Sequence, residues 1–264
     1  MSCITLLSDF GLIDASVASA KGILMQYTPH IPIIDISHSI EPFHGQQAAY
    51  ILASAYKNFP EGSVHIILFD VFSEKEPRLL LCENEGHYFL APDNGILSLA
   101  FNNKPDNVWS CMELTKQNVF KDWLHQAASI IKQLQTSSAA SLQLKSCELK
   151  NAPVHWLPKV NGNVVECHVI HIDRFENVVI NITQTQFEEV QKGRPFRIQF
   201  MRDEEINTLR KHYSDEREGE KLCRFNATGY LEIAINRGKA ASLFGLRLHQ
   251  KQHVMYNTIK IFFE

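Results

Sequence analysis

Short apolar segments alternate with helical segments over residues 1–135, and this alternation restricts the chain to few architectures. Short strands are expected at 4–8, 33–36, 64–69, 78–82 and 87–91. Helices are expected at 15–27, from Gly45 onward and at 122–134. Strands that alternate with helices form a largely parallel sheet covered by helices. We therefore predict an N-terminal α/β domain with a mostly parallel sheet.

The spacing of apolar residues changes in the second half of the 264-residue chain. The polar stretch 136–146, rich in serine and glutamine, predicts a linker. Beyond it, helices are expected only at 203–212 and 239–245, whereas strands are expected at 164–172, 178–182, 196–200, 221–226, 231–235 and 253–263. The sequence thus predicts an α/β domain over residues 1–148 and a mainly antiparallel β C-terminal domain over residues 149–264.

Charge and cysteine usage exclude several classes of protein. The chain has 26 Lys and Arg against 29 Asp and Glu, so no basic excess favours a nucleic acid as partner. Six cysteines are scattered singly, and the N-terminus has no basic start. Both features are typical of a reduced, cytoplasmic protein. No apolar run approaches the roughly 18 residues of a membrane helix, so no membrane contact is expected.

The usual sequence motifs of metal and cofactor sites do not occur. None of the 12 histidines is part of H-E-x-x-H or of another metal-binding spacing, so we predict no metal site. The motifs G-x-G-x-x-G, P-loop and G-x-S-x-G are also missing, which excludes the common dinucleotide, nucleoside-triphosphate and serine-hydrolase sites.

Polar residues follow three of the predicted strands at the point where each strand ends. Asp9 follows the first strand, Ser37 and His38 follow the second, and Asp70 follows the third. In open α/β sheets, ligands bind at the carboxyl ends of the strands. Capping of the next helix explains each aspartate equally well when it is taken alone. Two aspartates at two strand ends together favour a site.

Three further polar segments each have two explanations. Residues 91–95, Ala-Pro-Asp-Asn-Gly, fit either a tight turn or part of a site. Residues 173–177 form a polar strand end whose single aromatic either stacks on a flat ligand or packs in the core. Residues 226–238 alternate like a strand and end in Asn-Arg-Gly. That end fits a hairpin, or a place where backbone amides hold the edge of a base.

Four segments that occur in order are more specific together than any one alone. They are Ser-Asp-Phe-Gly-Leu-Ile-Asp (8–14), Ala-Pro-Asp-Asn-Gly-Ile-Leu (91–97), Ile-Asp-Arg-Phe-Glu-Asn (172–177) and Gly-Tyr-Leu-Glu-Ile-Ala-Ile-Asn-Arg-Gly (229–238). From Ile4 to about Leu246, the chain resembles the S-adenosyl-L-methionine hydrolases that form adenosine, relatives of the fluorinases and chlorinases. The run Ile-Asp-Ile-Ser-His at 34–38 is similar to that family's Val-Asp-Ile-Thr-His.

The resemblance implies a fold, an assembly and a reaction. Members of the family have an N-terminal α/β domain and a C-terminal β domain, and they form homotrimers. The ligand lies between the first domain of one subunit and the second domain of its neighbour. Water or hydroxide attacks the ribose C5′ of S-adenosyl-L-methionine, which gives adenosine and L-methionine. The leaving group is a neutral thioether, so positioning and desolvation of the nucleophile suit the reaction, and no cofactor is expected.

The resemblance also assigns residues to the substrate. Asp9 matches an aspartate that grips the ribose hydroxyls, and Ser16 matches a serine that holds the methionine amine in the halogenases. The other positions assigned to the methionine amine, the adenine or the matched turn are Asn94, Asp173, Phe175, Asn177, Asn236 and Arg237.

The chain departs from the family in its catalytic set. Asp70 and Arg78 match the family's aspartate and arginine, with one more residue between them and without the Pro-Gly-Val-Gly turn. Lys121 takes the place of the family's histidine, and His125 follows four residues later. Glu176 replaces the glycine of the Phe-Gly-Asn motif. The predicted catalytic residues are therefore Asp70, Arg78 and Lys121.

Two activities compete on this basis. The leading hypothesis is a hydrolase in which Asp70 and Arg78 act on the attacking water. The alternative is a catalytically degenerate homologue that binds adenosine or S-adenosyl-L-methionine without turnover. A halide-dependent transferase is less favoured, because the carboxylate of Asp70 stands where the halogenases carry tyrosine and would repel a halide.

Overall fold

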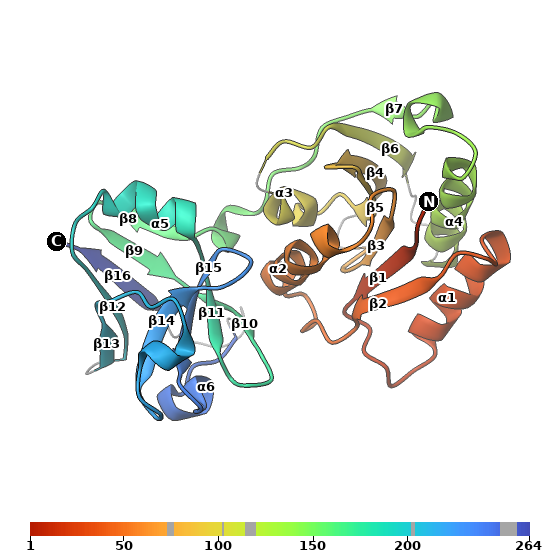
Figure 1. Ribbon diagram of the computed structural model, residues 1–264. Helices are drawn as coiled ribbons and strands as arrows, with labels where there is room; N and C mark the ends of the chain where they lie inside the picture. The colour runs from red at the N-terminus through yellow and green to blue at the C-terminus, as the bar shows by residue number, and fades with distance from the viewer. Residues whose placement is uncertain (73–76, 102, 114–119, 202–203, 249–257) are drawn as a thin grey trace. The chain divides into compact units, whose positions relative to one another are not determined.

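The computed structural model describes residues 1–72, 77–101, 103–113, 120–201, 204–248 and 258–264 (Figure 1). The chain divides into two compact units, Met1–Ala152 and Pro153–Glu264. Each unit has its own hydrophobic core. In the described part of the chain, no helix combines the length and the apolarity that crossing a membrane requires.

The first unit contains a seven-stranded sheet in the order β2-β1-β3-β5-β4-β6-β7. Its parallel part consists of β2 (Ile33–Ser37), β1 (Ile4–Ser8), β3 (Val64–Leu68) and β5 (His87–Pro92). Its antiparallel part consists of β4 (Arg78–Asn84), β6 (Asn107–Glu113) and β7 (Lys145–Ser146). The predicted α/β class is confirmed, and the sheet is mixed. Because β4 runs antiparallel to β5, β4 begins at the edge where the parallel strands end.

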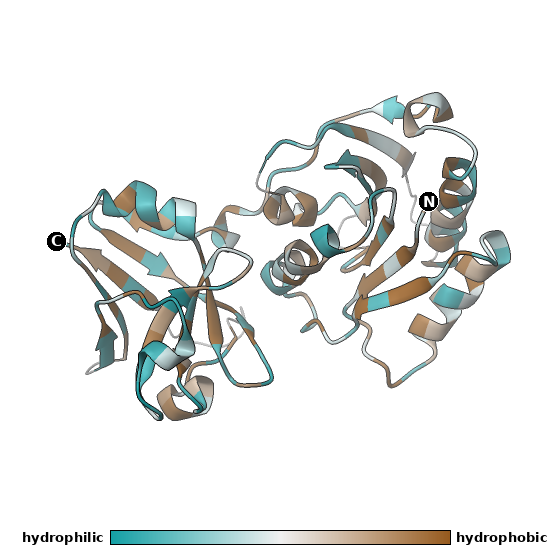
Figure 2. Cartoon of the chain, viewed as in Figure 1, coloured by the Kyte–Doolittle hydropathy of each residue, from teal (hydrophilic) through white to brown (hydrophobic). Residues whose placement is uncertain are grey.

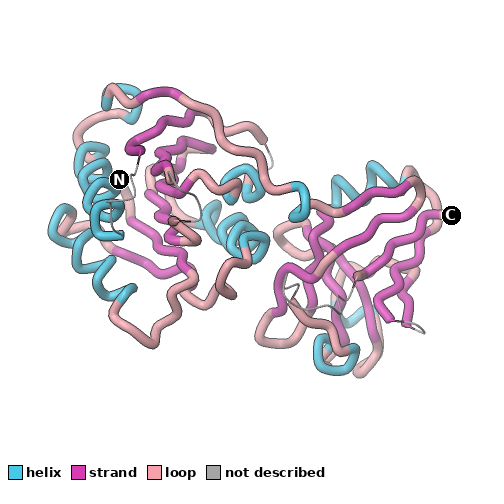
Figure 3. The backbone as a smooth tube through the Cα atoms, turned by 180° about the vertical axis from the view of Figure 1, so that it is seen from behind, coloured by secondary structure: helices cyan, strands magenta, loops and turns pink. Residues whose placement is uncertain are grey.

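Helices cover both faces of this sheet (Figures 1 and 3). One face is covered by α1 (Ser16–Tyr27) and α4 (Phe120–Leu134), and the other by α2 (Gly45–Ala55) and α3 (Ile96–Ala100). Successive side chains of a strand point to opposite faces, so Ile66 of β3 joins one core and Ile67 the other. This arrangement explains why β3 is apolar without interruption.

A buried polar cluster lies within the α2 face of the sheet. Thr5 Oγ1 lies 2.7 Å from His65 Nδ1, and His65 Nε2 lies 3.2 Å from His87 Nδ1. The rings of Phe89 and Tyr56 pack against His65, with centroids 4.9 and 6.0 Å away. The His65 imidazole is thus enclosed by aromatic side chains, and the His87 ring also contacts Tyr56, with centroids 5.6 Å apart. Burial, followed by the charge of His87, lowers the pKa of His65 to about 3.

The second unit consists of two antiparallel sheets that pack face to face around one core. The four-stranded sheet has the order β10 (Val169–Ile172), β11 (Val178–Thr183), β15 (Tyr230–Ile235) and β14 (Lys221–Phe225). The five-stranded sheet has the order β13 (Glu204–Ile206), β12 (Phe196–Met201), β16 (Ile259–Phe263), β9 (Val164–Cys167) and β8 (Lys159–Asn161). Figure 2 shows apolar residues, in brown, along most of these strands. The mainly antiparallel β class is confirmed.

Short helices complete the second unit. Helix α5 (Gln184–Gln191) begins with a capping box in which Thr183 and Gln186 satisfy each other's backbone amides. Helix α6 (Ala240–Phe244) occupies the predicted helical segment at 239–245. The predicted strand at 164–172 is divided at His168, where the chain leaves one sheet for the other. The His168 amide donates to Asn181 Oδ1 at 2.8 Å, which stabilises the change of sheet.

Two sequence predictions are wrong. The helix expected at 203–212 does not form over the described residues 204–212, and residues 204–206 are instead β13, which pairs with β12 so that Ile206 enters the core. The linker expected at 136–146 belongs to the first unit, because β7 pairs with β6 and Ala139 is buried against α4's core. The first part of the strand expected at 253–263 lies outside the described residues, and β16 occupies its end.

Candidate active site

Asp9 and Asp70 meet at the edge where the parallel strands of the first unit end. Asp9 follows β1 and Asp70 lies two residues beyond the end of β3. The backbone amides of Phe43 and Asp70 donate to the Asp9 carboxyl group. Burial raises the pKa of Asp9 above its ordinary value, and the charge of Asp70 adds to this rise, whereas the amide bonds oppose it. A carboxylate in this position is an anchored acceptor for hydroxyl groups.

Asn94 braces the backbone in front of Asp70. Its Nδ2 donates to the carbonyl of Phe69 at 3.1 Å, and its Oδ1 accepts from the Ile96 amide at the start of α3 at 3.2 Å. Asp70 itself has a φ of 44°, a left-handed conformation that aspartate tolerates better than most residues. The Asn94 side chain thus engages both neighbouring backbone segments, and the structure brings Asp9, Asp70 and Asn94 together.

Arg78 lies at the same edge, at the start of β4, and is paired with Asp93. Its guanidinium Nη2 forms an ion pair with Asp93 Oδ2, and the Asp93 side chain is only 2% exposed. The second oxygen of Asp93 accepts from the Lys150 amide at 3.0 Å. The sequence predicted only a turn at Asp93, and the bond to Arg78 was not predicted. Only the antiparallel pairing of Leu79 with Pro92 reveals that the two residues are adjacent.

Lys121 is placed beside the Asp9 loop by an aromatic contact. The rings of Phe10 and Phe120 meet edge to face with centroids 5.1 Å apart. Phe10 follows Asp9 and Phe120 precedes Lys121, so the first turn of α4 lies next to the loop after β1. Ser16 begins α1 at the end of that loop, and its amide donates to Asp14 at 2.8 Å.

His125 is engaged elsewhere on the first unit. Its Nδ1 lies 3.2 Å from the hydroxyl of Tyr27. Tyr27 is the last residue of α1, whereas the Asp9 loop leads into the first residue of that helix. His125 therefore contacts the end of α1 that is remote from Asp9.

His38 supports the Asp9 loop from behind. Its Nδ1 lies 2.6 Å from Ser8 Oγ, and its carbonyl accepts from the Gly11 amide at 2.8 Å. Its Nε2 lies 3.0 Å from Asp35, which also pairs with Lys21 at 2.6 Å. Because His38 contacts residues on both sides of Asp9, it stabilises the turn that presents the Asp9 carboxylate.

In the second unit, Asp173 organises the loop that carries Phe175 and Asn177. Its Oδ1 accepts from the amides of both residues at 2.9 Å, and its Oδ2 accepts from Asn177 Nδ2 at 3.0 Å. Asn177 is buried, whereas the Phe175 side chain is 72% exposed. The hydrogen bonds of Asp173 therefore hold the loop backbone in place, and the ring of Phe175 is exposed to solvent.

Glu176 reaches away from this loop toward α6. Its carboxylate accepts from the Ser242 amide at 2.9 Å and pairs with Lys239 at 2.9 Å, and its carbonyl accepts from the Ala241 amide. Hydrogen bonds from the Ser242 side chain and from Lys239 lower the pKa of Glu176. The residue has a φ of 65°, where glycine is favoured. The glutamate thus takes a backbone conformation suited to glycine and ties the loop to α6.

Asn236 and Arg237, the two residues that follow β15, have different contacts. The Asn236 side chain donates to the carbonyl of Glu216 at 2.8 Å, so it fixes the neighbouring backbone. Arg237 is exposed, has a φ of 54° and lies 3.7 Å from Glu218.

Tyr213 and Glu232 extend the polar cluster of the second unit and were not found from the sequence. The Tyr213 hydroxyl donates to Glu232 at 2.7 Å and lies 3.5 Å from Asn177 Nδ2. The Arg224 guanidinium stacks on the Tyr213 ring at 4.9 Å. Burial raises the pKa of Glu232. A buried glutamate in the matched 229–238 segment was the available signal, but its partner is 19 residues away in sequence.

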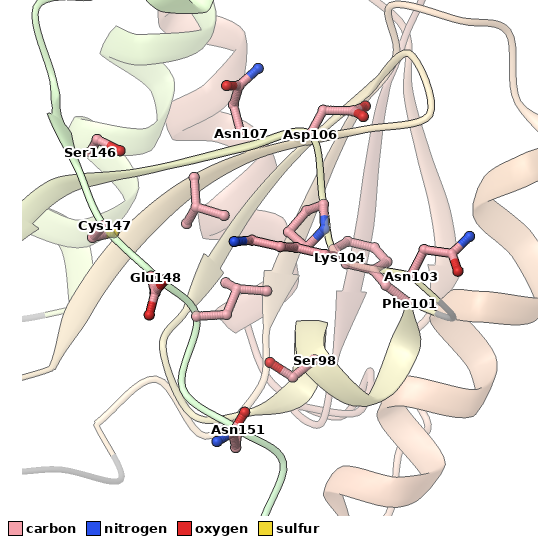
Figure 4. Close-up of a pocket in the computed structure, with 13 residues that line it drawn as sticks. Ser98, Phe101, Asn103, Lys104, Asp106, Asn107, Ser146, Cys147, Glu148 and Asn151 are labelled. Carbon is pink, nitrogen blue, oxygen red and sulfur yellow. The ribbon is translucent and has the colours of Figure 1, made fainter.

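A pocket of about 580 Å³ lies elsewhere on the first unit (Figure 4). It is lined mainly by polar residues of 98–108 and 146–151, including Lys104, Asp106 and Glu148. None of the residues predicted for the site lines it, so the chemistry and this pocket do not coincide. Among the described residues, no group of three or more His, Cys, Asp or Glu side chains is placed to hold a metal ion.

Comparison with solved structures identifies the fold class. The chain superposes on an uncharacterised conserved protein from Thermotoga maritima with a TM-score of 0.77 and 24% identity, covering 98% of this chain and 99% of that one. A conserved hypothetical protein from Thermus thermophilus gives a TM-score of 0.72 at 23% identity, with 100% of both chains covered. The α/β unit followed by an antiparallel β unit is thus an established two-part architecture.

Comparison with protein families identifies the family. Residues 4–144 match the SAM hydroxide adenosyltransferase N-terminal domain, and residues 167–252 match the SAM hydroxide adenosyltransferase C-terminal domain. The chain belongs to the SAM hydroxide adenosyltransferase family.

Curated relatives match over nearly the whole chain. The (R)-S-adenosyl-L-methionine hydrolase of Salinispora tropica is 27% identical over 259 residues, which is 92% of this chain and 94% of the relative. The protein of the same name from Methanocaldococcus jannaschii is 25% identical, with 97% of each chain covered. A fluorinase from Nocardia brasiliensis is 22% identical, covering 92% of this chain and 93% of the fluorinase.

Proposed function

We propose that this chain hydrolyses S-adenosyl-L-methionine to adenosine and L-methionine. The observation that carries the proposal is the junction of Asp9 and Asp70 at the carboxyl edge of the sheet, with Asn94 beside them and Arg78 at the same edge. Membership of the SAM hydroxide adenosyltransferase family supports it, as do relatives named (R)-S-adenosyl-L-methionine hydrolase.

In the proposed mechanism, Asp9 binds the ribose and Asp70 and Arg78 act on the water. A carboxylate that accepts from both ribose hydroxyls fixes the sugar and therefore the direction of C5′. The Arg78 guanidinium favours hydroxide over water, and Asp70 orients the nucleophile and accepts its proton. The oxygen bonds to C5′ as the C5′–sulfur bond breaks. The electron pair of the broken bond stays on the sulfur, which becomes the neutral thioether of methionine. Lys121, beside the Phe10–Phe120 contact, contributes positive charge.

The residues of the second unit are proposed to bind the remainder of the substrate. The exposed ring of Phe175 offers a face on which adenine stacks. Asp173 and Asn177 contact the methionine amine and the adenine, and Ser16 assists at the amine. Asn236 and Arg237 present backbone to the adenine edge.

A homotrimer, in which a neighbouring subunit completes the site, is part of the same proposal. The loops after β1, β2 and β3 carry large apolar side chains around the Asp9–Asp70 edge, namely Leu12, Ile13, Phe43 and Phe72, with exposures of 72, 103, 79 and 44%. Clustered exposed apolar side chains are typical of protein interfaces. A cytoplasmic location stays a prediction from the sequence.

The subunit arrangement predicts that Ile13→Asp dissociates the oligomer. A charge at a fully exposed apolar loop position is harmless in an isolated subunit and costly in a buried interface. We expect a smaller mass by light scattering and at least a tenfold loss of adenosine formation. Met25→Asp, at an exposed position on α1, is the matched control. A wild-type protein that is monomeric would contradict the arrangement.

The direct test of hydrolysis is to incubate the purified protein with S-adenosyl-L-methionine and to follow adenosine by chromatography. Adenosine must form faster than in the uncatalysed reaction. Protein that binds the substrate in calorimetry and forms no adenosine above that rate would refute the hydrolase proposal.

Asp9→Asn should weaken adenosine binding without unfolding the protein. Asparagine keeps the shape of the side chain but loses the charge and one acceptor oxygen. The loss should be on the order of 1.5–3 kcal/mol, roughly ten- to hundredfold in affinity. Calorimetry and melting temperature are measured on the same variant, with the exposed Asp106→Asn as control. Unchanged affinity with a lowered melting temperature would mean that Asp9 only supports its turn.

A second candidate function is ligand binding without turnover. It is favoured by Lys121 in the family's histidine position and by the engagement of His125 with Tyr27. It predicts binding of adenosine or S-adenosyl-L-methionine with no product. Lys121→His should then raise adenosine formation if the remaining groups are competent.

A further inference from the structure

Asp93 contacts Arg78 through both its side chain and its backbone. The two form an ion pair across the first positions of β4 and the end of β5, and the Asp93 amide also donates to the Arg78 carbonyl at 3.1 Å. Side chain and backbone of Asp93 therefore both bind Arg78. We infer that Asp93 is a positioning residue, which holds the Arg78 guanidinium in the orientation that hydrolysis requires.

The Asp93 carboxylate is suited to this role because it is itself immobile. Its side chain is buried, and its two oxygens have separate partners, since Oδ1 accepts from the Lys150 amide at 3.0 Å and Oδ2 binds Arg78. Because one oxygen is held by a backbone amide, the carboxylate presents only its other oxygen to Arg78. The guanidinium that pairs with this oxygen is therefore held in one orientation.

Arg78 needs such a partner because of its own flexibility. Its side chain is 30% exposed and belongs to the first residue of β4, at the edge of the sheet that carries the site. Arginine has many rotamers, and those that point into solvent compete with the one that faces the nucleophile. Its planar group carries five N–H donors, so one carboxylate at Nη2 orients the plane while other donors serve further acceptors.

The inference rests on the proposed hydrolysis and adds a residue that acts through Arg78. The charge of Asp93 lies behind the guanidinium, and Asp93 is not expected to touch the substrate. Its loss should therefore lower kcat and leave KM unchanged, since ground-state binding depends on Asp9 and on the second unit.

Asp93→Asn tests the inference directly. Asparagine still has an oxygen for the Lys150 amide but no charge for Arg78. We expect kcat for adenosine formation to fall about 10- to 100-fold, with KM and adenosine affinity within about twofold of wild type. The rise of kcat with pH should shift to higher pH, because Arg78 no longer favours hydroxide. A merely structural role would lower the melting temperature and leave this profile unchanged.

A double-mutant cycle shows whether Asp93 acts through Arg78. If it does, Asp93→Asn has no further effect on kcat in an Arg78→Ala protein, so the double variant equals Arg78→Ala. Multiplicative losses would overturn the inference. Glu205→Gln is the matched control, because it removes the carboxylate partner of Arg197 in the second unit, 3.4 Å away, and should leave kcat unchanged.

The outcomes separate this inference from the proposed function. A wild-type protein that forms no adenosine refutes both. An active wild type with Asp93→Asn as active as Glu205→Gln refutes the positioning role alone. If Asp93→Asn does not fold, Asp93→Glu takes its place, since the longer carboxylate meets Arg78 from a shifted position. That variant should lose kcat at least threefold, and wild-type kcat would overturn the inference.

Discussion

Asp70→Asn should lower kcat for adenosine formation by about 10²- to 10⁴-fold, the range expected when a positioned acid–base group is removed. Asparagine suits the test because it tolerates the left-handed conformation of Asp70, whose φ is 44°. The backbone amide that Asp70 gives to Asp9 is retained. Adenosine affinity should therefore stay close to that of the wild type.

The measurements for Asp70→Asn are the initial rate of adenosine formation and the binding of adenosine by calorimetry. Asp106→Asn, at an exposed position, is the control. Equal rates for the two variants would exclude Asp70 from the chemistry. Parallel losses of rate and affinity would show instead that Asp70 acts by holding the Asp9 carboxyl group.

Acidification should unfold the protein through His65, the second large effect. Burial and the neighbouring His87 lower the pKa of His65 from its ordinary 6.5 to about 3 in the folded protein. The lowered pKa means that the folded protein keeps the His65 ring neutral, whereas the unfolded chain protonates it more readily. The free energy of unfolding is therefore highest above pH 6.5 and decreases as the pH falls from 6.5 toward 3. The full loss of stability is on the order of 5 kcal/mol.

Urea denaturation at a series of pH values measures this loss. His65→Gln should flatten the dependence of the unfolding free energy on pH below 6.5, although it also lowers stability at neutral pH because it disturbs the contacts to Thr5 and His87. His30→Gln, at an exposed position, should leave the pH dependence unchanged. The same slope in His65→Gln as in the wild type would contradict the assignment.

Local patterns in the sequence were sufficient to predict most elements and the edge that carries the candidate site. Apolar runs such as 64–69 indicate buried strands because both faces of the strand are covered. Asp9 and Asp70 were predicted from their places after strands, since the carboxyl ends of parallel strands share one edge. Their roles in catalysis stay predictions.

Contacts that depend on the register of paired strands or on the packing of helices could not be predicted. Asp93 is 15 residues from Arg78 and meets it only because β4 turns back along β5. His125 is 98 residues from Tyr27, and the packing of α1 on α4 decides which way its ring points. The 203–212 segment was predicted as helix, but pairing of residues 204–206 with β12 makes them a strand.

The order of strands in the first sheet has a consequence for how this site can change during evolution. Asp70 follows β3 and Arg78 begins β4, and these two strands are separated in the sheet by β5. Two steps between neighbouring strands span roughly 10 Å, and this distance is maintained by hydrogen bonding across β5. The number of residues that join Asp70 to Arg78 does not affect the distance between the two strands. Insertions and deletions in that connection can accumulate while both functional groups keep their positions, so the spacing counted along the chain is a poor measure of whether the pair is intact.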